Sequence, residues 1–180
     1  MDLIVAVDKN WGIGLKGELL ISISEDHKRF KEITTGNVVV MGRKTLLTLP
    51  GSKPLKNRVN IVLSRDEDLK IEGAIVYHSI TEFLESLKDH SPGRGPSAVG
   101  TPPGEEKKVY VIGGQDIYEQ LLPHCKKAYI TKVEKEFEAD SYFPDLDADE
   151  KWRMVNRSET RQSDDIFYYY IEYENIQHIQ

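Results

Sequence analysis

The chain has 180 residues and carries 24 lysines and arginines against 30 aspartates and glutamates, which gives a net charge of −6. This length suits one domain spanning residues 1–180, and the negative charge argues against a nucleic-acid-binding protein, which needs a broad basic face. The single cysteine excludes an internal disulfide and a cysteine-based zinc site, and no apolar run approaches the ~20 residues of a membrane span.

Strand-like and helix-like patterns alternate along most of the chain. Residues 2–7 form a β-branched apolar run that predicts a buried strand, and glycines punctuate residues 12–17. Residues 24–36 predict a helix with Ser24 as its N-cap and Gly36 at its end. Further strands are expected at 37–41, 58–65, 74–78, 108–114 and 126–134, and helices at 42–49, 81–90 and 115–122. Residues 152–159 and 165–174 alternate in the manner of an antiparallel edge pair.

This order predicts an α/β fold, in which a sheet is parallel over most of its width, has an antiparallel C-terminal edge and is flanked by helices. Residues 90–106 interrupt the pattern, because they hold four of the eight prolines and show no apolar periodicity. We interpret them as a flexible surface insertion, and a partner-docking loop is the alternative that the composition leaves open.

Gly12, Gly14 and Gly17 match the G-x-G-x-x-G spacing of a dinucleotide-binding turn. That motif requires a helix to start at once, so that a pyrophosphate can lie on its N-terminus. The residues that follow, ELLISIS, are β-branched and serine-rich and form a poor helix start. A mobile glycine loop beside the first strand is therefore the better interpretation.

Two other segments are candidate anion sites. Arg43, Lys44 and Thr45 follow a strand at a helix start, where exposed N–H groups favour an anion, although a solvated basic turn fits equally well. Arg65 ends the next strand, and these cations together suit a phosphate monoester such as the 2′-phosphate of NADP. The pair Gly113-Gly114 ends a strand before a helix, so phosphates could approach the backbone, but a plain turn is the alternative.

Asp26 is the candidate acid of a site. An acid in the first turn of a helix usually just complements the helix dipole. Asp26, Phe30 and Ile33, however, fall at positions i, i+4 and i+7, which places the carboxylate on the same face as two apolar residues. We therefore expect burial to raise the pKa of Asp26.

Taken together, several stretches resemble the dihydrofolate reductase family over nearly the whole chain. They are LIVAVDKNWGIG, GEL, EDHKRFKEITTGNVVVMGRKT, LPGSKPLKNRVNIVLSR, VYVIGGQDIY, ITKVE and EADSYFP, in the order and spacing of the family. The resemblance implies a central, mainly parallel eight-stranded sheet. It also implies NADPH-dependent reduction of 7,8-dihydrofolate to 5,6,7,8-tetrahydrofolate by hydride transfer to pterin C6, in one-carbon metabolism, with antifolates as inhibitors.

The resemblance also assigns residues to the substrate. Asp26 and Thr131 are the expected catalytic residues, and Asp26, supported by Thr131, is expected to hydrogen-bond the 2-amino group and N3 of the pterin. Arg58 is expected to bind the glutamate α-carboxylate. The substrate set is Ile4, Val5, Asp26, Phe30, Lys31, Leu49, Arg58, Ile112, Tyr118 and Thr131.

For NADPH, the resemblance places Ala6, Ile13 and Gly14 beside the nicotinamide and assigns the phosphates to the candidate anion segments. The loop at 12–19 corresponds to a mobile loop that closes over the cofactor. The full cofactor set is Ala6, Ile13, Gly14, Gly17, Leu19, Gly42, Arg43, Lys44, Thr45, Leu63, Ser64, Arg65, Gly113, Gly114, Gln115, Asp116 and Ile117.

The chain departs from the family after Leu19, where Leu20 and Ile21 replace a Pro-Trp pair and Ser24 replaces a second proline. His27 stands where the family prefers an apolar residue, and we interpret it as a helix-surface histidine. Two alternatives remain from sequence: a reductase of the same fold acting on a ribosylamino-pyrimidine in riboflavin synthesis, and a catalytically silent NADP-binding protein. We expect a cytoplasmic monomer, since no cleavable signal pattern follows Met1 and no long apolar stripe is left uncovered.

Overall fold

The computed structural model describes residues 1–89 and 107–178, so the predicted insertion at 90–106 lies outside the described residues. The strands are β1 (Asp2–Val7), β2 (Gly12–Leu15), β3 (Glu18–Leu19), β4 (Val38–Gly42), β5 (Val59–Leu63), β6 (Ala74–Tyr77), β7 (Val109–Gly113), β8 (Lys127–Val133), β9 (Ser141–Tyr142), β10 (Trp152–Arg157), β11 (Arg161–Ser163) and β12 (Ile166–Asn175). The helices are α1 (Ser24–Thr34), α2 (Arg43–Thr48), α3 (Ile80–Asp89) and α4 (Gln115–Leu121).

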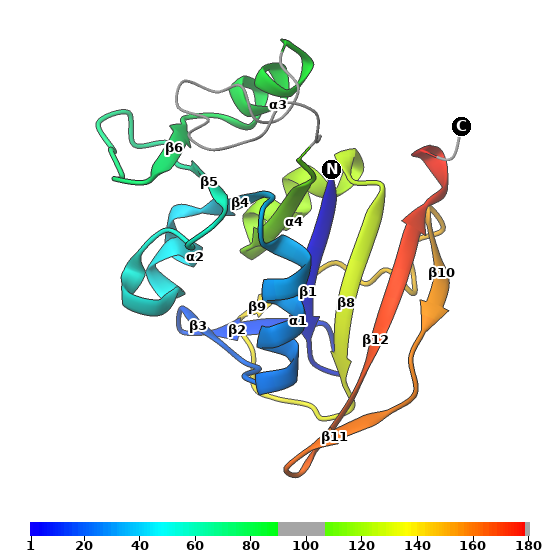
Figure 1. Ribbon diagram of the computed structural model, residues 1–180. Coiled ribbons are helices and arrows are strands. Elements are labelled where there is room, and N and C mark those ends of the chain that lie inside the picture. The colour runs from blue at the N-terminus through cyan, green and yellow to red at the C-terminus, as the bar shows by residue number, and fades with distance from the viewer. Residues whose placement is uncertain (90–106, 179–180) are drawn as a thin grey trace.

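The main sheet follows the order β10-β12-β8-β1-β7-β4-β5-β6, and β11 adds a short pairing to β12. The strands from β8 through β6 pair in parallel. Strand β12 runs antiparallel to β8 and to β10, and Figure 1 shows these C-terminal strands at one edge of the sheet. The predicted mainly parallel sheet with an antiparallel C-terminal edge is confirmed.

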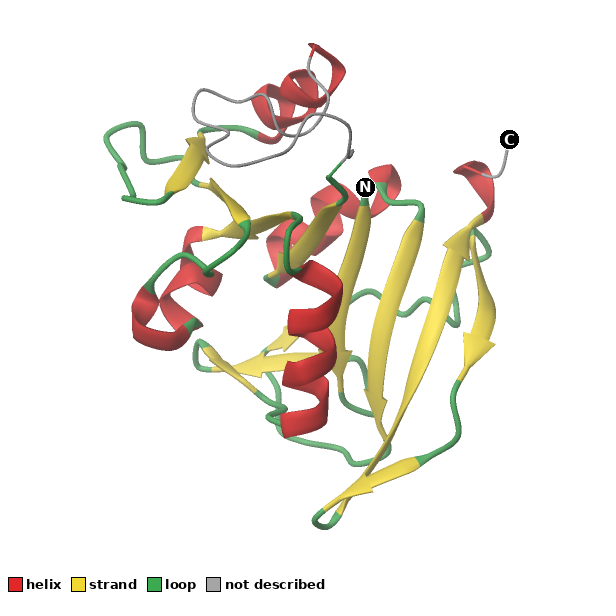
Figure 2. Ribbon diagram, in the orientation of Figure 1, coloured by secondary structure: helices red, strands yellow, loops and turns green. Residues whose placement is uncertain are grey.

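The parallel strands are apolar runs because both of their faces are covered. In β4, the side chains from Val38 to Met41 are all buried, and Leu3 and Val7 of β1 are fully buried. Figure 2 shows helix α1 lying across the face of the central strands. This arrangement brings one face of α1 to the carboxyl ends of the parallel strands.

Helix α1 begins at the predicted cap residue itself, one residue earlier than expected. Ser24 is the first helical residue, Ile23 takes the flanking position with extended backbone, and no side chain caps the first turn. The expectation that Ser24 is the N-cap is therefore wrong. Gly36 has a φ of +80°, as expected of the residue that ends a helix.

The glycine loop forms a hairpin instead of a helix, which agrees with setting aside the dinucleotide-binding motif. Strands β3, β2 and β9 make a separate three-stranded sheet. The buried carboxylate of Asp8 fixes the start of this hairpin by accepting hydrogen bonds from the backbone N–H groups of Asn10, Gly12 and Phe137 at 2.8, 2.8 and 2.9 Å. Among residues 1–89 and 107–178, no helix has the length and apolar character needed to cross a membrane.

Candidate active site

A cavity of about 1620 Å³ opens where the carboxyl ends of the parallel strands meet α1, α2, α4 and the β2–β3 hairpin. Ligands of open α/β sheets bind at this edge. The volume exceeds the roughly 300–1,000 Å³ of an ordinary small-molecule site. The cavity therefore has room for two ligands side by side.

At the inner wall of the cavity, Asp26 of α1 faces Thr131 of β8, whose hydroxyl donates a hydrogen bond to the carboxylate. Thr131 is 1% exposed, so it supports the acid from behind. Burial raises the pKa of Asp26, whereas the Thr131 hydrogen bond and the nearby Arg29 and His27 lower it. The other carboxylates on the wall, within the described residues, are exposed: Glu18, Asp66, Asp116 and Glu119.

Around this acid the wall is apolar. Ile4 and Val5 of β1, Phe30 of α1 and Ile112 of β7 all line the cavity. Tyr118 of α4 is buried and donates a hydrogen bond of 2.8 Å from its hydroxyl to the carbonyl of Ile4, and burial raises its pKa. A flat ring with one polar edge fits between such a wall and the carboxylate.

Arg58 lies at the outer end of the same wall. Its Nε donates to the carbonyl of Lys56 and its Nη1 to the hydroxyl of Thr34, both at 3.0 Å. These two bonds fix the plane of the guanidinium, and its burial lowers the pKa of Arg58. A fixed guanidinium plane suits bidentate binding of a carboxylate.

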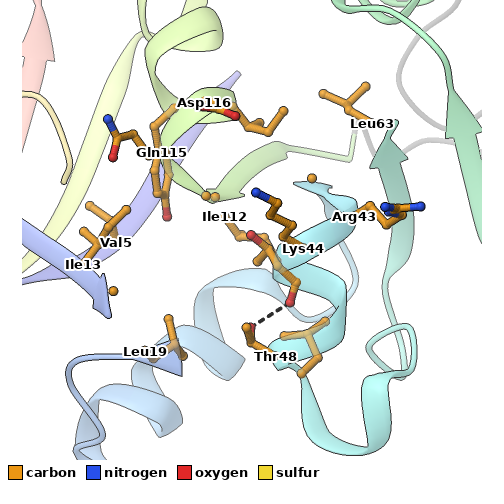
Figure 3. Close-up of a pocket in the computed structure, with 18 of the residues that line it drawn as sticks. Val5, Ile13, Leu19, Arg43, Lys44, Thr48, Leu63, Ile112, Gln115 and Asp116 are labelled. Carbon is orange, nitrogen blue, oxygen red and sulfur yellow. Dashed lines mark hydrogen bonds between the residues drawn. The ribbon is translucent and has the colours of Figure 1, made fainter. Parts of the chain in front are cut away.

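Figure 3 shows the opposite end of the cavity, where Arg43 and Lys44 of α2 lie beside Leu63 of β5. Thr45, Ser64 and Arg65 line the same region, so cations and hydroxyls gather there. Arg43 pairs with Asp66 at 3.4 Å between Nη1 and Oδ2, with both side chains about half exposed. This end of the cavity therefore has side chains of the kind that can bind an anion.

A glycine pair joins the two ends. The peptide bond between Gly113 and Gly114 is cis, and Gly113 has a φ of +115°. A β-carbon on Gly113 would lie 3.1 Å from the ring of Tyr118, so any other residue would displace the wall. Gln115 and Asp116 follow at the start of α4 and line the cavity (Figure 3).

The β2–β3 hairpin covers the mouth. Figure 3 places Leu19 of β3 across the cavity from Thr48 of α2. Asp140 holds the hairpin in place, because its carboxylate accepts a hydrogen bond of 2.7 Å from the backbone N–H of Lys16 and its own N–H donates to the carbonyl of Gly14 at 3.0 Å. The first of these bonds is the main cause that lowers the pKa of Asp140.

All of the substrate and cofactor residues predicted from sequence line this cavity, except Thr131, which lies behind Asp26. His27 is exposed, as expected, and also lines the wall. Ile21, at the position of the family's tryptophan, lines the cavity too. Sequence reasoning missed a further group of lining residues: Glu18, Ser22, Thr48, Pro50, Leu55, Asp66, His78, Ser79, Ile80, Thr81, Glu119, Gln120 and Ser141. Residues 78–81 had a usable signal, because they join the carboxyl end of a parallel strand to a helix start.

Comparisons with known proteins give a consistent result. A family model for dihydrofolate reductase matches residues 1–175. The dihydrofolate reductase of Bacillus subtilis (strain 168) is 33% identical over 156 residues, which cover 87% of this chain and 82% of the relative. That of Drosophila melanogaster is 35% identical over 156 residues, which cover 79% of this chain and 78% of the relative.

The fold is also similar to a solved structure of dihydrofolate reductase from Enterococcus faecalis complexed with NADP(H) and RAB-propyl. The TM-score is 0.77 at 31% sequence identity, and the match covers 96% of this chain and 94% of that chain.

Proposed function

Because the chain belongs to the dihydrofolate reductase family, we propose that its cavity binds dihydrofolate between Asp26 and Arg58 and NADPH between the glycine pair and Arg43. The activity is NADPH-dependent reduction of 7,8-dihydrofolate to tetrahydrofolate. The two ends of the cavity bind different ligands. The substrate end has a half-buried acid in an apolar wall, and the cofactor end has a group of cations.

At the substrate end, the pterin lies against Ile4, Val5 and Ile112 with its polar edge toward Asp26. The ionised carboxylate accepts hydrogen bonds from the 2-amino group and N3, and Thr131 holds the carboxylate in the orientation this requires. The benzoyl ring passes between Phe30 and Leu49, and the α-carboxylate of the glutamate reaches Arg58. Lys31, one helical turn beyond His27 on α1, lies beside this path.

The residues at the other end fit NADPH. Arg43, Lys44 and Arg65 supply the charge for the 2′-phosphate, and Thr45 and Ser64 supply hydroxyls for the phosphates. Gly114 and the start of α4 let the pyrophosphate approach the backbone. Ala6, Ile13 and Gly14 form the surface for the nicotinamide, next to the pterin wall.

NADPH, when bound, supplies the hydride that reduces the pterin at C6. The protein contributes by holding the two rings in reacting geometry and by excluding water with the β2–β3 hairpin. N5 takes its proton from water, and the negative charge of Asp26 favours the protonated pterin over the neutral one. Asp26 thus acts on the ring electrostatically from its amino-pyrimidine edge.

The observation that carries this proposal is the Asp26–Thr131 pair, a half-buried carboxylate with a hydroxyl partner in an otherwise apolar wall. The test is Asp26→Asn, with Glu25→Gln as the matched control, because Glu25 is an exposed acid next to Asp26 on the same helix. We expect D26N to lower turnover of dihydrofolate at pH 7 by at least about 100-fold, with NADPH affinity unchanged. Unchanged turnover in D26N would rule out the assignment.

The matches favour dihydrofolate over a ribosylamino-pyrimidine, because the relatives described above are dihydrofolate reductases. Arg58 supports the same choice, since a pyrimidine substrate has no glutamate tail for it to bind. We expect antifolates to compete with dihydrofolate for the wall around Asp26, and we expect the protein to be a monomer in solution, which sedimentation analysis would test.

A further inference from the structure

Helix α1 carries a second charged residue on its sheet-facing side. Arg29 stands three residues after Asp26, so the two side chains leave the helix on neighbouring lines. Arg29 is half-buried, and its guanidinium carbon lies 4.2 Å from the ring centre of Tyr170 and 6.0 Å from that of Tyr129. Its Nη1 is buried and has no hydrogen-bond partner among the described residues.

The register of the sheet connects this arginine to the site. Tyr170 of β12 is paired with Thr131 of β8, and directly opposite residues of an antiparallel pair point to the same face. Thr131 donates its hydroxyl to Asp26, and Tyr170 stacks under Arg29. Two contacting pairs from three elements, Asp26 with Thr131 and Arg29 with Tyr170, therefore lie next to each other on this face of the sheet.

Packing alone does not account for a charge in this place. Within residues 1–89 and 107–178, Arg29 makes no ion pair at salt-bridge distance. Removing a guanidinium from water is unfavourable unless charge or hydrogen bonds compensate it, and an unbranched apolar side chain would cover Tyr170 without that penalty. The groups that can compensate are the faces of Tyr129 and Tyr170 and the carboxylates of Asp26 and Glu172.

We propose that Arg29 is a positioning residue for the reaction, which holds Asp26 in its ionised form against Thr131 through a guanidinium fixed on Tyr170. This inference rests on the proposed function of Asp26. Arg29 does not line the cavity, so it would not contact substrate or cofactor. Its charge would act on the reaction only through Asp26.

The electrostatics of the group support this role. Burial raises the pKa of Asp26, and Arg29 is among the groups that lower it, after the Thr131 hydrogen bond and before His27. The titratable groups around Asp26 are His27 and Arg29 on α1, Tyr118 on α4 and Tyr170 on β12. Tyr170 is neutral at physiological pH, as tyrosines ordinarily are, and burial raises its pKa further, to about 12. Arg29 is therefore the permanent cation of the group.

The test compares Arg29→Met with Lys28→Met in the full chain. Both variants remove one positive charge from α1, but Lys28 is exposed and points to solvent. The direct readout is the ¹³C chemical shift of the Asp26 carboxyl carbon, followed against pH and assigned by its absence in D26N. The second readout is the pH profile of single-turnover hydride transfer, measured at saturating NADPH and dihydrofolate. We expect R29M to move both midpoints upward by at least about 0.5 pH unit, and K28M by less than about 0.2.

Rescue variants separate charge from packing. Arg29→Lys keeps the charge and should restore at least half of the shift, and Tyr170→Phe keeps the ring and should leave the midpoint unchanged. Tyr170→Leu removes the ring that fixes the guanidinium, so it should move the midpoint upward, and it serves as the test if R29M does not fold. Affinity for NADPH should stay within about twofold of the parent protein in R29M, as expected of a residue with no ligand contact.

The proposal would be overturned if R29M or Y170L had the same midpoint as the parent protein. It would also be overturned if K28M shifted the midpoint as much as R29M does. Failure of the role proposed for Arg29 can be told apart from failure of the function proposed for Asp26. If D26N turns over dihydrofolate normally, the assignment of Asp26 fails whatever Arg29 does. If D26N is inactive and R29M shows no shift, only the role of Arg29 fails.

Discussion

The ammonium nitrogen of Lys132 lies 3.4 Å from the centre of the Trp11 ring, on the face of β8 opposite to Thr131. Consecutive residues of a strand point to opposite faces, so β8 supports the acid with Thr131 and the hairpin with Lys132. Trp11 has a φ of +66°, immediately precedes β2 and packs on Phe143, with ring centres 6.1 Å apart. The base of the hairpin that covers the cavity is thus tied to the back of the same strand.

We predict that Lys132→Met weakens NADPH binding by roughly 3- to 10-fold, because a partly desolvated cation–π contact contributes about 0.7–1.4 kcal/mol to the position of Trp11. Global stability should change little, since Lys132 is 7% exposed and its burial lowers its pKa, so removing the ammonium also removes a desolvation penalty. Fluorescence titration with NADPH and urea unfolding measure the two effects. Lys135→Met is the control, because Lys135 is an exposed lysine paired with Asp165. Unchanged NADPH affinity in K132M would contradict the prediction.

The sequence predicted the sheet well because buried parallel strands appear as continuous apolar runs, as in VVVM of β4. It also made Asp26 a candidate, because its helical spacing with Phe30 and Ile33 puts a carboxylate on an apolar face, but the expected role of Asp26 came from the family resemblance. The Lys132–Trp11 contact could not be predicted, since it joins residues 121 positions apart across the back of the sheet, where no periodicity connects them. The stacking of Arg29 on Tyr170 could not be predicted either, because it depends on the register between β8 and β12.

Asp26→Asn is predicted to raise stability at pH 7 while it removes activity. Burial raises the pKa of Asp26 above 3.8, so the folded state holds the proton more tightly than the unfolded state. The stabilisation that comes from this tighter proton binding is fully present below the pKa that Asp26 has in the unfolded chain. It is lost as the pH rises through the pKa that Asp26 has in the folded state. At pH 7 the parent protein therefore carries an unfavourable charge, and D26N should be more stable by roughly 0.5–2 kcal/mol.

Urea unfolding of D26N and the parent protein at pH 7 and at the lowest pH where both fold measures this effect. The difference should shrink toward acid pH, where Asp26 is protonated in both states. Glu25→Gln should show no comparable gain, because Glu25 is exposed. A D26N protein less stable than the parent at pH 7 would show that the carboxylate stabilises the fold.

Asp66→Asn is predicted to increase NADPH affinity by about 2- to 5-fold, because the surface pair with Arg43 at 3.4 Å competes with the 2′-phosphate for the guanidinium. Arg43→Gln should have the opposite effect, lowering NADPH affinity by more than about 10-fold and leaving NADH affinity unchanged. The two cofactors are compared by their KM values at low and high salt, where screening should reduce the D66N effect. Asp68→Asn, an exposed neighbour outside the cavity wall, is the control. Equal effects on NADPH and NADH would place Arg43 away from the 2′-phosphate.

Ile21→Trp restores the residue type that the family carries at this position, yet we predict that it destabilises this chain by about 1–3 kcal/mol. Ile21 is 6% exposed and packs in a buried cluster with Ile23, Val133 and Tyr168, although it also borders the cavity. An indole at this position would have to displace the cluster or leave it to enter the cavity, and either change loses packing. Thermal unfolding should show a decrease of about 2–4 °C per kcal/mol for a chain of this size. Leu19→Trp, at a position that is 62% exposed, is the control for the effect of an added indole on stability. If I21W were as stable as the parent protein, the cluster around Ile21 would have to be loosely packed. Lack of room would then not explain why this chain lacks the family's tryptophan. Turnover measurements on I21W would in that case show whether the indole N–H affects the reaction.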